Sequence, residues 1–439
     1  MKDKTTKKRR TPRWFALDNA AKIYPAAKSR EWSNVFRLSA TMKDEVDTDI
    51  LRLAVANTAP RFPSIAARLR RGVFWFYLKE LDTPPEILEE QPYPLLRMSN
   101  KEMCRCAIRV LVYGKRIAVE LFHSLTDGTG GLTFLKTLLA EYVTLRYGVE
   151  VPPECGILTR DEEPRPEELR DDFLRFAGDV KASRKESDAY RVRGTREFGG
   201  FLNLTTFKMK ADELKKASHG YGVTVTTMLT AALLRALLLL EEEEIPNKKR
   251  RKSAKVLVPV NLRPLFGSSS LRNFAMYTIP EADPRLGDFT LEELCRLVHH
   301  KLGLEVTAKN MSRMIATNVE SERMLLLRVT PLFLKNVVMK AIFNAVGERK
   351  SCLSFSNLGV VKLPPEMEEH IDRFDFVLGV QATAPYNCGL ITFGDTAYMN
   401  FIRDIKEPRL EYAFYSVLRE IGITPTVESN RPRELKEIK

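Results

Sequence analysis

The chain has 439 residues, of which 44% are hydrophobic and 29% are charged. These proportions are typical of a globular protein, and the length predicts at least two domains. A chain of this size buries enough apolar surface to fold without disulfides or structural metals, which excludes the small cross-linked scaffolds.

The formal net charge of +13 is concentrated at the N-terminus. Residues 1–13 carry seven Lys or Arg against one Asp and few apolar residues, which predicts a disordered basic tail. The charge allows contact with nucleic acid or an anionic membrane surface. Specific binding of nucleic acid is not expected, because no interleaved aromatic residues and no recognition helix accompany it. We do not expect the tail to be a signal peptide, since no apolar stretch follows the basic residues.

Six cysteines are few for this length. Cys104 and Cys106 form a C-x-C pair in a predicted strand, and the other four are scattered. No pair of C-x-x-C motifs is present, so we expect no zinc site, and we expect reduced thiols in a cytoplasmic protein. The most apolar stretch, 228–240, is too short to span a bilayer and predicts a buried amphipathic helix rather than a transmembrane segment.

Hydrophobic periodicity divides the chain into a basic tail (1–13), a first subdomain (14–153), a charged crossover linker (154–195) and a second subdomain (196–439). In the first subdomain we predict ordered structure from residue 14, strands at 36–40, 74–79, 106–113 and 116–122, a helix at 44–56, and a helix that Gly130 and Gly131 open. The linker is predicted to be partly helical.

The second subdomain shows a similar mixture of elements. We predict helices at 211–218, 224–240, 291–306, 321–345 (interrupted at Pro331) and 410–421, strands at 201–209, 256–260, 351–356, 374–380, 390–393 and 397–402, and a charged loop at 241–255. Strands mixed with helices in both parts predict an α/β or α+β protein with two similarly built halves.

His123 is the candidate catalytic residue. It follows a strand in which Ile117, Val119 and Leu121 alternate, and a histidine on that apolar face is often only a core residue. Asp127 follows four positions later in a turn that contains three glycines, where the backbone can bend sharply and approach a ligand. A neutral imidazole takes a proton from a hydroxyl or amine near pH 7, as acyl transfer from a thioester requires.

The remaining histidines are less suited to this role. His219 precedes a helix-ending glycine, His370 is predicted in a polar helix, and the pair His299 and His300 is predicted on a surface helix without an aspartate turn. Acyl transfer also needs a donor for the tetrahedral oxyanion, but no metal and no redox cofactor.

The run from Phe122 to Gly128 (F-H-S-L-T-D-G) resembles the H-H-x-x-x-D-G motif of the superfamily that includes chloramphenicol acetyltransferase, nonribosomal-peptide condensation domains and plant acyl-CoA-dependent acyltransferases. The first histidine of the motif is Phe122 in this chain. The resemblance implies that His123 is the general base. It also implies that Asp127, with Gly128, holds the loop through an ion pair with an arginine rather than moving protons.

Further segments resemble the bacterial alcohol acetyltransferase-like branch of this superfamily: 14–25, 128–139, 258–264, 271–274 and 356–359. The resemblance implies that Arg263 is the partner of Asp127. It places Ser356, Asn357, Gly359 and Asn273 as possible oxyanion or channel residues. The implied fold is a two-layer α/β (α+β) protein whose two chloramphenicol-acetyltransferase-like subdomains form a V with a central channel.

The resemblance therefore implies an acyltransferase with no bound cofactor. It would move an acyl group from acyl-CoA, possibly acetyl-CoA, to a small-molecule alcohol or amine. Two alternatives stay open: a condensation-like enzyme that uses acyl groups on a carrier protein in trans, and a catalytically silent relative that only binds a ligand or partner. The sequence specifies neither the acyl chain length, nor the acceptor, nor the oligomeric state.

Overall fold

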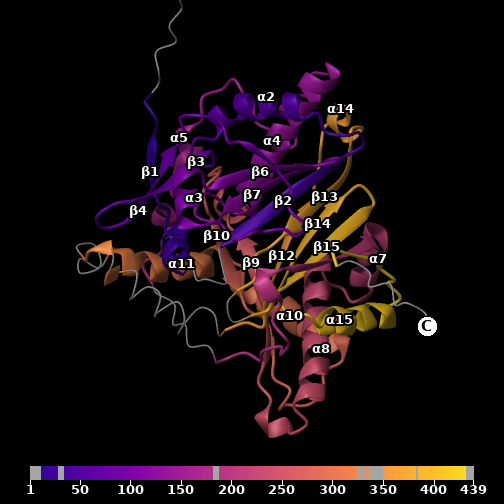
Figure 1. The fold of residues 1–439 in the computed structure, drawn as a ribbon. Coiled ribbons are helices and arrows are strands. Elements are labelled where there is room, and N and C mark those ends of the chain that lie inside the picture. The colour runs from indigo at the N-terminus through magenta and orange to yellow at the C-terminus, as the bar shows by residue number, and fades with distance from the viewer. Residues whose placement is uncertain are drawn as a thin grey trace, which may run out of the picture.

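A computed structural model describes residues 11–27, 34–180, 187–323, 330–332, 334–335, 350–381 and 384–431 (Figure 1). Residues 1–10 of the predicted basic tail and most of the predicted helix 321–345 lie outside the described residues. Arg13 already belongs to the folded part, since its backbone N–H donates to a carboxylate oxygen of Glu80 at 2.9 Å.

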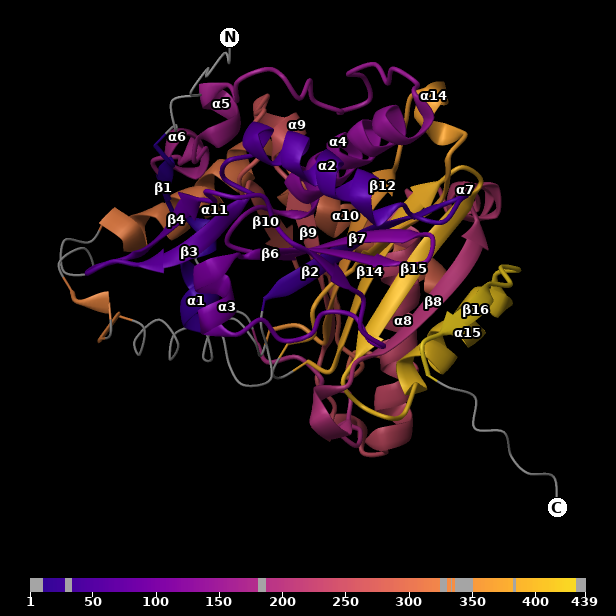
Figure 2. The same ribbon diagram turned by 45° about the horizontal axis from the view of Figure 1, so that its top comes forward.

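The first large sheet has the strand order β13-β2-β7-β6-β5. Its strands are β2 (Val35–Met42), β5 (Ile87–Glu89), β6 (Ile108–Tyr113), β7 (Arg116–Phe122) and β13 (Ile371–Val377). The predicted hairpin is confirmed, because β6 and β7 pair antiparallel on either side of Gly114. Helices α2 (Thr48–Thr58) and α4 (Gly128–Tyr147) lie side by side over one face of this sheet (Figure 2).

A small sheet of β1 (Trp14–Ala16), β4 (Phe76–Glu80) and β3 (Ala67–Arg71) adjoins the first sheet. The prediction that Cys104 and Cys106 lie in a strand is wrong. Cys104 lies in helix α3 (Asn100–Arg105), and Cys106 caps its end. Ser99 and Glu102 form a capping box that starts this helix, and such reciprocal bonds favour a helix over the strand that the apolar pattern predicted.

The second large sheet has the order β10-β9-β12-β14-β15-β8-β16, with β11 (Glu281–Ala282) paired to β9. Its other strands are β8 (Asn203–Lys210), β9 (Ala254–Asn261), β10 (Ala275–Thr278), β12 (Leu353–Val360), β14 (Tyr386–Phe393), β15 (Thr396–Arg403) and β16 (Thr426–Ser429). One face forms a hydrophobic core with α8 (Val225–Glu244), α10 (Leu291–Glu305) and α15 (Arg409–Glu420), while α7 (Ala211–Gly220) packs at its edge. The predicted mixed α/β architecture is confirmed.

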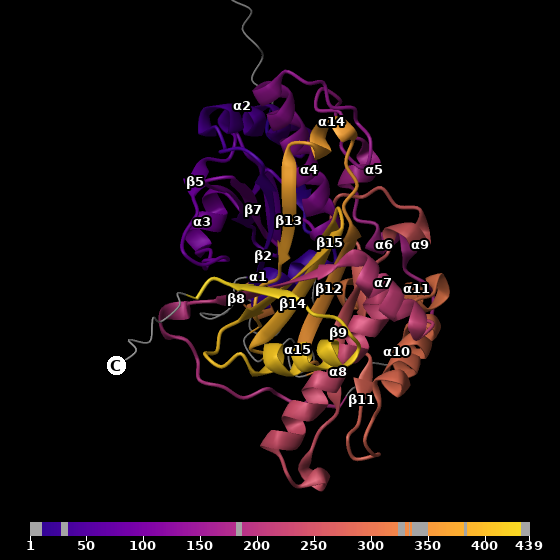
Figure 3. The ribbon, with the colours of Figure 1, turned by 90° about the vertical axis from the view of Figure 1, so that its right-hand side faces the viewer.

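Strand β13 joins the two halves, because it comes late in the chain but forms an edge of the first sheet (Figure 3). It pairs antiparallel with β2 from Ile371 opposite Met42 to Val377 opposite Arg37. The other face of the second sheet also contributes Ile391 to the core of the first. The second sheet therefore contributes to two hydrophobic cores, one on each of its faces.

The crossover between the halves contains two short helices, as predicted, α5 (Pro166–Leu169) and α6 (Phe173–Phe176). Glu168 of α5 forms a buried ion pair with Arg61 at 2.6 Å. Phe173 of α6 packs in a third apolar cluster with Phe274 and with Met311 of α11 (Ala308–Arg323). The crossover is thus packed against both halves.

The charged loop predicted at 241–255 is shorter at both ends in the structure. Helix α8 continues through Glu244, and Ala254 begins β9. Glu241 is fully buried and accepts a hydrogen bond from the backbone of Lys252 at 2.6 Å, and the Tyr190 hydroxyl donates to Glu244 at 2.7 Å. Glutamate is a good helix former, and these buried partners make its burial tolerable.

Among the described helices, none by itself is long and apolar enough to cross a membrane. Helices α7 and α8 meet the length and composition requirement only as a pair, across a bend of 80°. Most residues of α8 are buried in the second core, as the sequence predicted for 228–240.

Candidate active site

His123 lies immediately after β7, where the sheet ends. Its backbone N–H donates to the carbonyl of Asn34 at 2.8 Å, which extends the pairing of β7 with β2 by one residue. The next residues turn, since the N–H of Leu125 donates to the carbonyl of Phe122 at 2.8 Å. These backbone hydrogen bonds fix His123 at the start of the turn that leads into α4. The residue as a whole is partly exposed to solvent.

Two aromatic rings hold the imidazole. Tyr24, from helix α1 (Ile23–Ala27), stacks on it with ring centroids 4.5 Å apart and an interplanar angle of 23°. Phe36 of β2 meets it edge-on at 5.2 Å. Burial lowers the pKa of His123 from its ordinary value of 6.5, and this outweighs the opposing effects of its own carbonyl, Asp127, Asn273 and Asp18. The ring is therefore neutral at pH 7.

Asn273 lies against the imidazole, on the side of Nδ1. Its Oδ1 is 3.0 Å from Nδ1 of His123. Its Nδ2 donates to the carbonyl oxygen of His123 at 3.0 Å and to Oδ2 of Asp18 at 3.2 Å. The sequence resemblance implied that Asn273 is a possible oxyanion or channel residue. In the structure both ends of its side-chain amide contact His123 or Asp18.

Asp18 is fully buried between β1 and the short helix η1 (Ala20–Lys22). Its carboxylate accepts from the backbone N–H of Ala21 at 2.7 Å and of Asn273 at 3.3 Å, and the guanidinium of Arg272 lies 3.4 Å away. Burial raises the pKa of Asp18 above its ordinary value of 3.8, because it outweighs the lowering by Arg272 and the hydrogen bonds. The partners of the carboxylate are nevertheless all donors, and this geometry favours its ionised form.

A second carboxyl group lies behind Asp18. Asp171 accepts from the backbone of Asn19 at 2.9 Å and of Phe173 at 3.1 Å. Burial, together with the charge of Asp18, raises the pKa of Asp171 to about 7.

Asp127 caps helix α4 and anchors the segment that carries Asn273. One carboxylate oxygen accepts from the N–H of Gly130 at 3.1 Å, and the other from Arg263 at 2.9 Å and from the N–H of Phe274 at 2.9 Å. Although burial raises the pKa of Asp127, Arg263 and the hydrogen bonds outweigh it and hold the pKa below 3.8. The carboxylate is therefore ionised and carries no proton to transfer.

Arg263 begins the short helix α9 (Arg263–Phe266) and cross-links the two halves. Besides its ion pair with Asp127, its guanidinium donates to the carbonyls of Ser270 at 2.7 Å and Arg272 at 2.6 Å. The hydroxyl of Thr126 donates to the carbonyl of Leu271 at 2.6 Å. These bonds fix the distance between the turn after His123 and the segment that holds Asn273.

The glycines of the turn are needed for close approach rather than for a special backbone bend. None of Gly128, Gly130 and Gly131 has a positive φ. A Cβ atom on Gly130 would lie 2.5 Å from the carbonyl oxygen of Leu271, and one on Gly131 would lie 2.8 Å from the side chain of Leu121. A Cβ on Gly128 would lie 2.9 Å from Leu358, so β12 touches the start of α4 at this point.

The strand predicted at 351–356 is longer in the structure. β12 continues through Val360, with an irregularity in its parallel pairing to β14 that Gly359 absorbs at a φ of +77°. The side chain of Asn357 donates to Thr226 at 2.9 Å and accepts from the N–H of Gly359 at 2.8 Å. Within the described residues, neither Ser356 nor Asn357 hydrogen-bonds His123.

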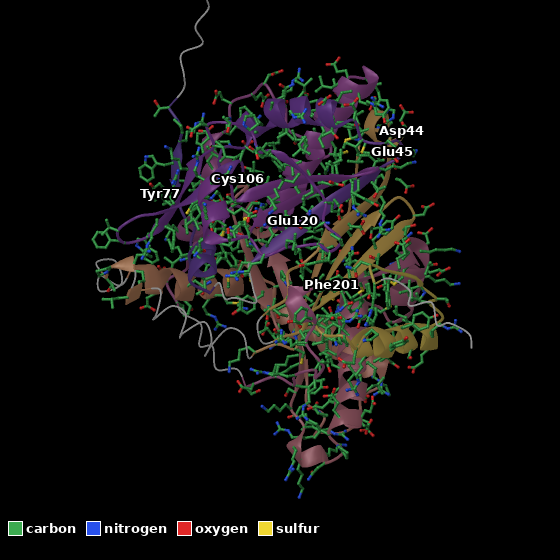
Figure 4. All side chains as sticks on the ribbon, in the orientation of Figure 1. Asp44, Glu45, Tyr77, Cys106, Glu120 and Phe201 are labelled. Atoms are coloured by element: carbon green, nitrogen blue, oxygen red, sulfur yellow. The ribbon has the colours of Figure 1, made fainter. Side chains whose placement is uncertain are left out.

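Two cavities lie on the face of the first sheet that is turned away from α4. Their volumes are about 330 and 600 Å³, and Arg37 and Tyr93 line both. Glu120, at the middle of the sheet (Figure 4), is buried beside the smaller cavity and accepts from Arg37 at 2.7 Å and Arg109 at 3.0 Å. The larger cavity lies between this sheet and strands β8 and β16, and His123 lines neither.

The other chemistry-bearing residues are dispersed. His299 and His300 are exposed on α10, and His370 stacks on Tyr147 with ring centroids 3.8 Å apart. Over the part of the chain that the structure describes, no three His, Cys, Asp or Glu side chains are grouped to hold a metal ion. His123 is therefore the histidine around which buried polar partners converge.

Similarity to proteins of known structure identifies the fold. No family model and no curated protein matches the sequence. TRI101 of Fusarium graminearum, complexed with ethyl coenzyme A, has a TM-score of 0.63 at 10% identity and covers 94% of this chain and 100% of that chain. The chain has the fold of the CoA-dependent acyltransferase and condensation-domain superfamily.

Two further structures with this acyltransferase fold are similar over almost the whole chain. The trichothecene 15-O-acetyltransferase TRI3 of Fusarium sporotrichioides has a TM-score of 0.60 at 13% identity, over 93% of this chain and 94% of that one. The condensation domain of the Monacolin K polyketide synthase MokA has a TM-score of 0.59 at 9% identity, over 94% and 97%. The fold expected from the sequence resemblance is confirmed.

The sequence did not identify every residue that surrounds His123. Tyr24, Asn34 and Phe36 contact it directly. Asp18 reaches it only through Asn273 and through its charge. Asp18 and Tyr24 do fall in the segment 14–25 that resembles the family, but their roles depend on residues about a hundred or more positions away, and no local spacing reveals them.

Proposed function

We propose that the chain is an acyltransferase that moves an acyl group from a thioester, acyl-CoA, to the hydroxyl or amine of a small molecule. The reaction is of the alcohol acetyltransferase type, and acetyl-CoA is among the candidate donors. The observation that supports it best is the neutral imidazole of His123, held at Nδ1 by Asn273 in a chain with the acyltransferase fold.

In this proposal His123 is the general base. Its imidazole takes the proton of the acceptor hydroxyl or amine as the oxygen or nitrogen attacks the thioester carbonyl. The tetrahedral intermediate then collapses, the carbon–sulfur bond breaks, and the imidazolium returns the proton to the departing thiolate. The products are an ester or amide and a free thiol, so no electrons and no further reactant are needed.

Asp127, Gly128 and Arg263 act indirectly in this reaction. Their ion pair and close packing hold the turn after β7, and therefore hold His123 in place. For the oxyanion we propose Ser356 as a donor, with Asn357 and Gly359 shaping its strand. We expect Ser356→Ala to lower kcat by about 10²- to 10³-fold. Little effect on kcat would remove Ser356 from this role.

The test is a variant of His123. We expect His123→Gln to lower the rate of thiol release from acyl-CoA by about 10²- to 10⁴-fold, with the melting temperature nearly unchanged. The matched control is His300→Gln, which removes an exposed imidazole from α10 and leaves the rate unaltered. The assay screens acetyl-CoA and longer acyl-CoAs against alcohols and amines.

Three other outcomes of these assays would change the proposal. Full turnover by His123→Gln would rule out the mechanism. Thiol release only from a loaded carrier protein would replace CoA with a carrier in trans as the donor. No turnover with either donor would identify a relative that only binds its ligand.

A further inference from the structure

We infer that Asp18 and Asn273 are positioning residues that decide which nitrogen of His123 accepts the proton. The inference rests on the proposed function and makes it more specific. Asp18 orients the amide of Asn273, the amide holds a hydrogen on Nδ1 of the imidazole, and Nε2 is left with the lone pair that works as the base.

The orientation of the Asn273 amide follows from its partners. One end of the amide lies 3.2 Å from the Asp18 carboxylate and 3.0 Å from the carbonyl oxygen of His123. Both partners only accept hydrogen bonds, so the NH₂ group must point at them. The oxygen of the amide therefore points at the imidazole, 3.0 Å from Nδ1.

The tautomer of His123 follows from the amide. A neutral imidazole carries one hydrogen, and the nitrogen that faces an acceptor keeps it. Nδ1 faces the amide oxygen of Asn273 and therefore carries the hydrogen. Among the described residues none hydrogen-bonds Nε2, so its lone pair remains available to a substrate.

Asp18 supplies the fixed point of this chain of contacts. It is fully buried, and the N–H of Ala21, the N–H of Asn273 and the guanidinium of Arg272 hold its carboxylate in place. An ionised carboxylate cannot donate, so the amide of Asn273 cannot rotate by half a turn without placing its oxygen against a negative charge. Its charge also stabilises the imidazolium that forms during transfer.

The first measurement is the tautomer itself, read from the ¹⁵N resonances of the protein labelled at histidine. The chain has five histidines, and the spectrum of His123→Gln identifies the signals of His123. We expect a hydrogen-bearing Nδ1 and an unprotonated Nε2 at pH 8. A wild-type spectrum with the hydrogen on Nε2 would overturn the inference. This measurement does not depend on turnover, so it separates this inference from the proposed function.

The second measurement uses Asn273→Ala, which removes the amide and leaves the backbone contact of Asp18 in place. We expect the Nε2–H tautomer to gain population and kcat to fall at least about tenfold with little change in KM. Asp18→Asn should act in the same direction. If that variant fails to fold because Arg272 loses its partner, Asn273→Ala carries the test alone. A wild-type tautomer and wild-type kcat in Asn273→Ala would contradict the inference.

The pH profile separates positioning from a merely structural role. The charged and titratable groups around His123 are Asp127 at the start of α4, Asp18 after β1 and Tyr24 of α1, with Arg263, Arg272 and Asp171 behind them. Asn273 and Asp18 both raise the pKa of the imidazole. Each variant should therefore move the acid limb of kcat/KM to lower pH.

The matched control is Asp171→Asn. It changes a carboxyl group that neighbours Asp18 but accepts from Asn19 and Phe173 rather than from Asn273. We expect it to leave the tautomer and the acid limb unchanged. An equal shift of the acid limb in this control would assign the effect to general electrostatics and would overturn the role of Asn273.

Discussion

In the role of general base that we propose, the imidazole of His123 must meet two requirements that usually oppose each other. A general base must be unprotonated near neutral pH, yet its conjugate acid must be stable enough to form during the reaction. Burial against Tyr24 and Phe36 meets the first requirement, because it disfavours the charged ring. The negative charges of Asp18 and Asp127 meet the second without direct contact with the substrate.

The direction of the pKa shift gives a testable pH dependence. Only the neutral form of His123 accepts a proton, so activity falls as pH falls through its pKa. Because burial lowers that pKa from 6.5, we expect the acid limb of kcat/KM to be centred below pH 6.5. Initial rates between pH 4.5 and 8 measure this limb. Melting curves at each pH provide the control for unfolding, and a limb centred above pH 6.5 would contradict the assignment.

At this scale the sequence predicts His123, Asp127 and Arg263 as site residues from a short motif, a strand-end position and a family resemblance, and the structure pairs Arg263 with Asp127. Asp18 is different. Its chemistry depends on Asn273, which follows 255 residues later, and on the fact that the carboxylate is fully buried. Neither property leaves a spacing in the chain, so folding has to bring the two residues together before their role is visible.

Helix α4 depends on one carboxylate for three separate functions. Asp127 caps the helix, pairs with Arg263 and holds the backbone of Phe274. An N-cap alone contributes about 1 kcal/mol, whereas a buried charge left without its partner costs several. Removing Arg263 is therefore expected to cost more than removing the cap alone.

We expect Arg263→Ala to lower the free energy of unfolding by about 3–5 kcal/mol, because it leaves Asp127 buried and unpaired. Urea unfolding curves measure the change. The control is Arg296→Ala on α10, whose pair with Glu292 at 3.7 Å is exposed and should contribute less than about 1 kcal/mol. Similar losses in the two variants would show that the clamp is no stronger than a surface pair.

The elements that the sequence predicted well are those with a clear period and a local cap. The hairpin of β6 and β7, the start of α4 and the start of α8 at Thr224 belong to this group. The elements predicted wrongly depend on distant partners. Glu241 is helical because Lys252 and the second core accommodate it, and β12 extends past Asn357 because β14 pairs with it.

At the scale of the molecule, the two halves are not independent units. β13 completes the first sheet although it follows most of the second half in sequence, and residues of the second sheet enter the first core. The sequence showed two similarly built halves but not this exchange, because an apolar alternating strand does not specify which sheet it joins.

This exchange predicts that the two halves unfold together. Trp14 and Trp75 report on the first half, whereas the buried thiols of Cys295, Cys352 and Cys388 report on the second. We expect tryptophan fluorescence and the labelling of these thiols to give the same urea midpoint. Far-UV circular dichroism should follow the same curve. Two separated transitions would mean that β13 does not couple the halves.

The position of β13 also matters while the protein is being made. Until residue 377 has left the ribosome, β2 presents an unpaired edge with apolar residues on one face. At synthesis rates of about 5–20 residues per second this edge is open for a time on the order of tens of seconds. An open strand edge invites pairing with other chains. A nascent chain therefore depends on rapid completion, on dilution or on a chaperone to protect β2 until β13 pairs with it.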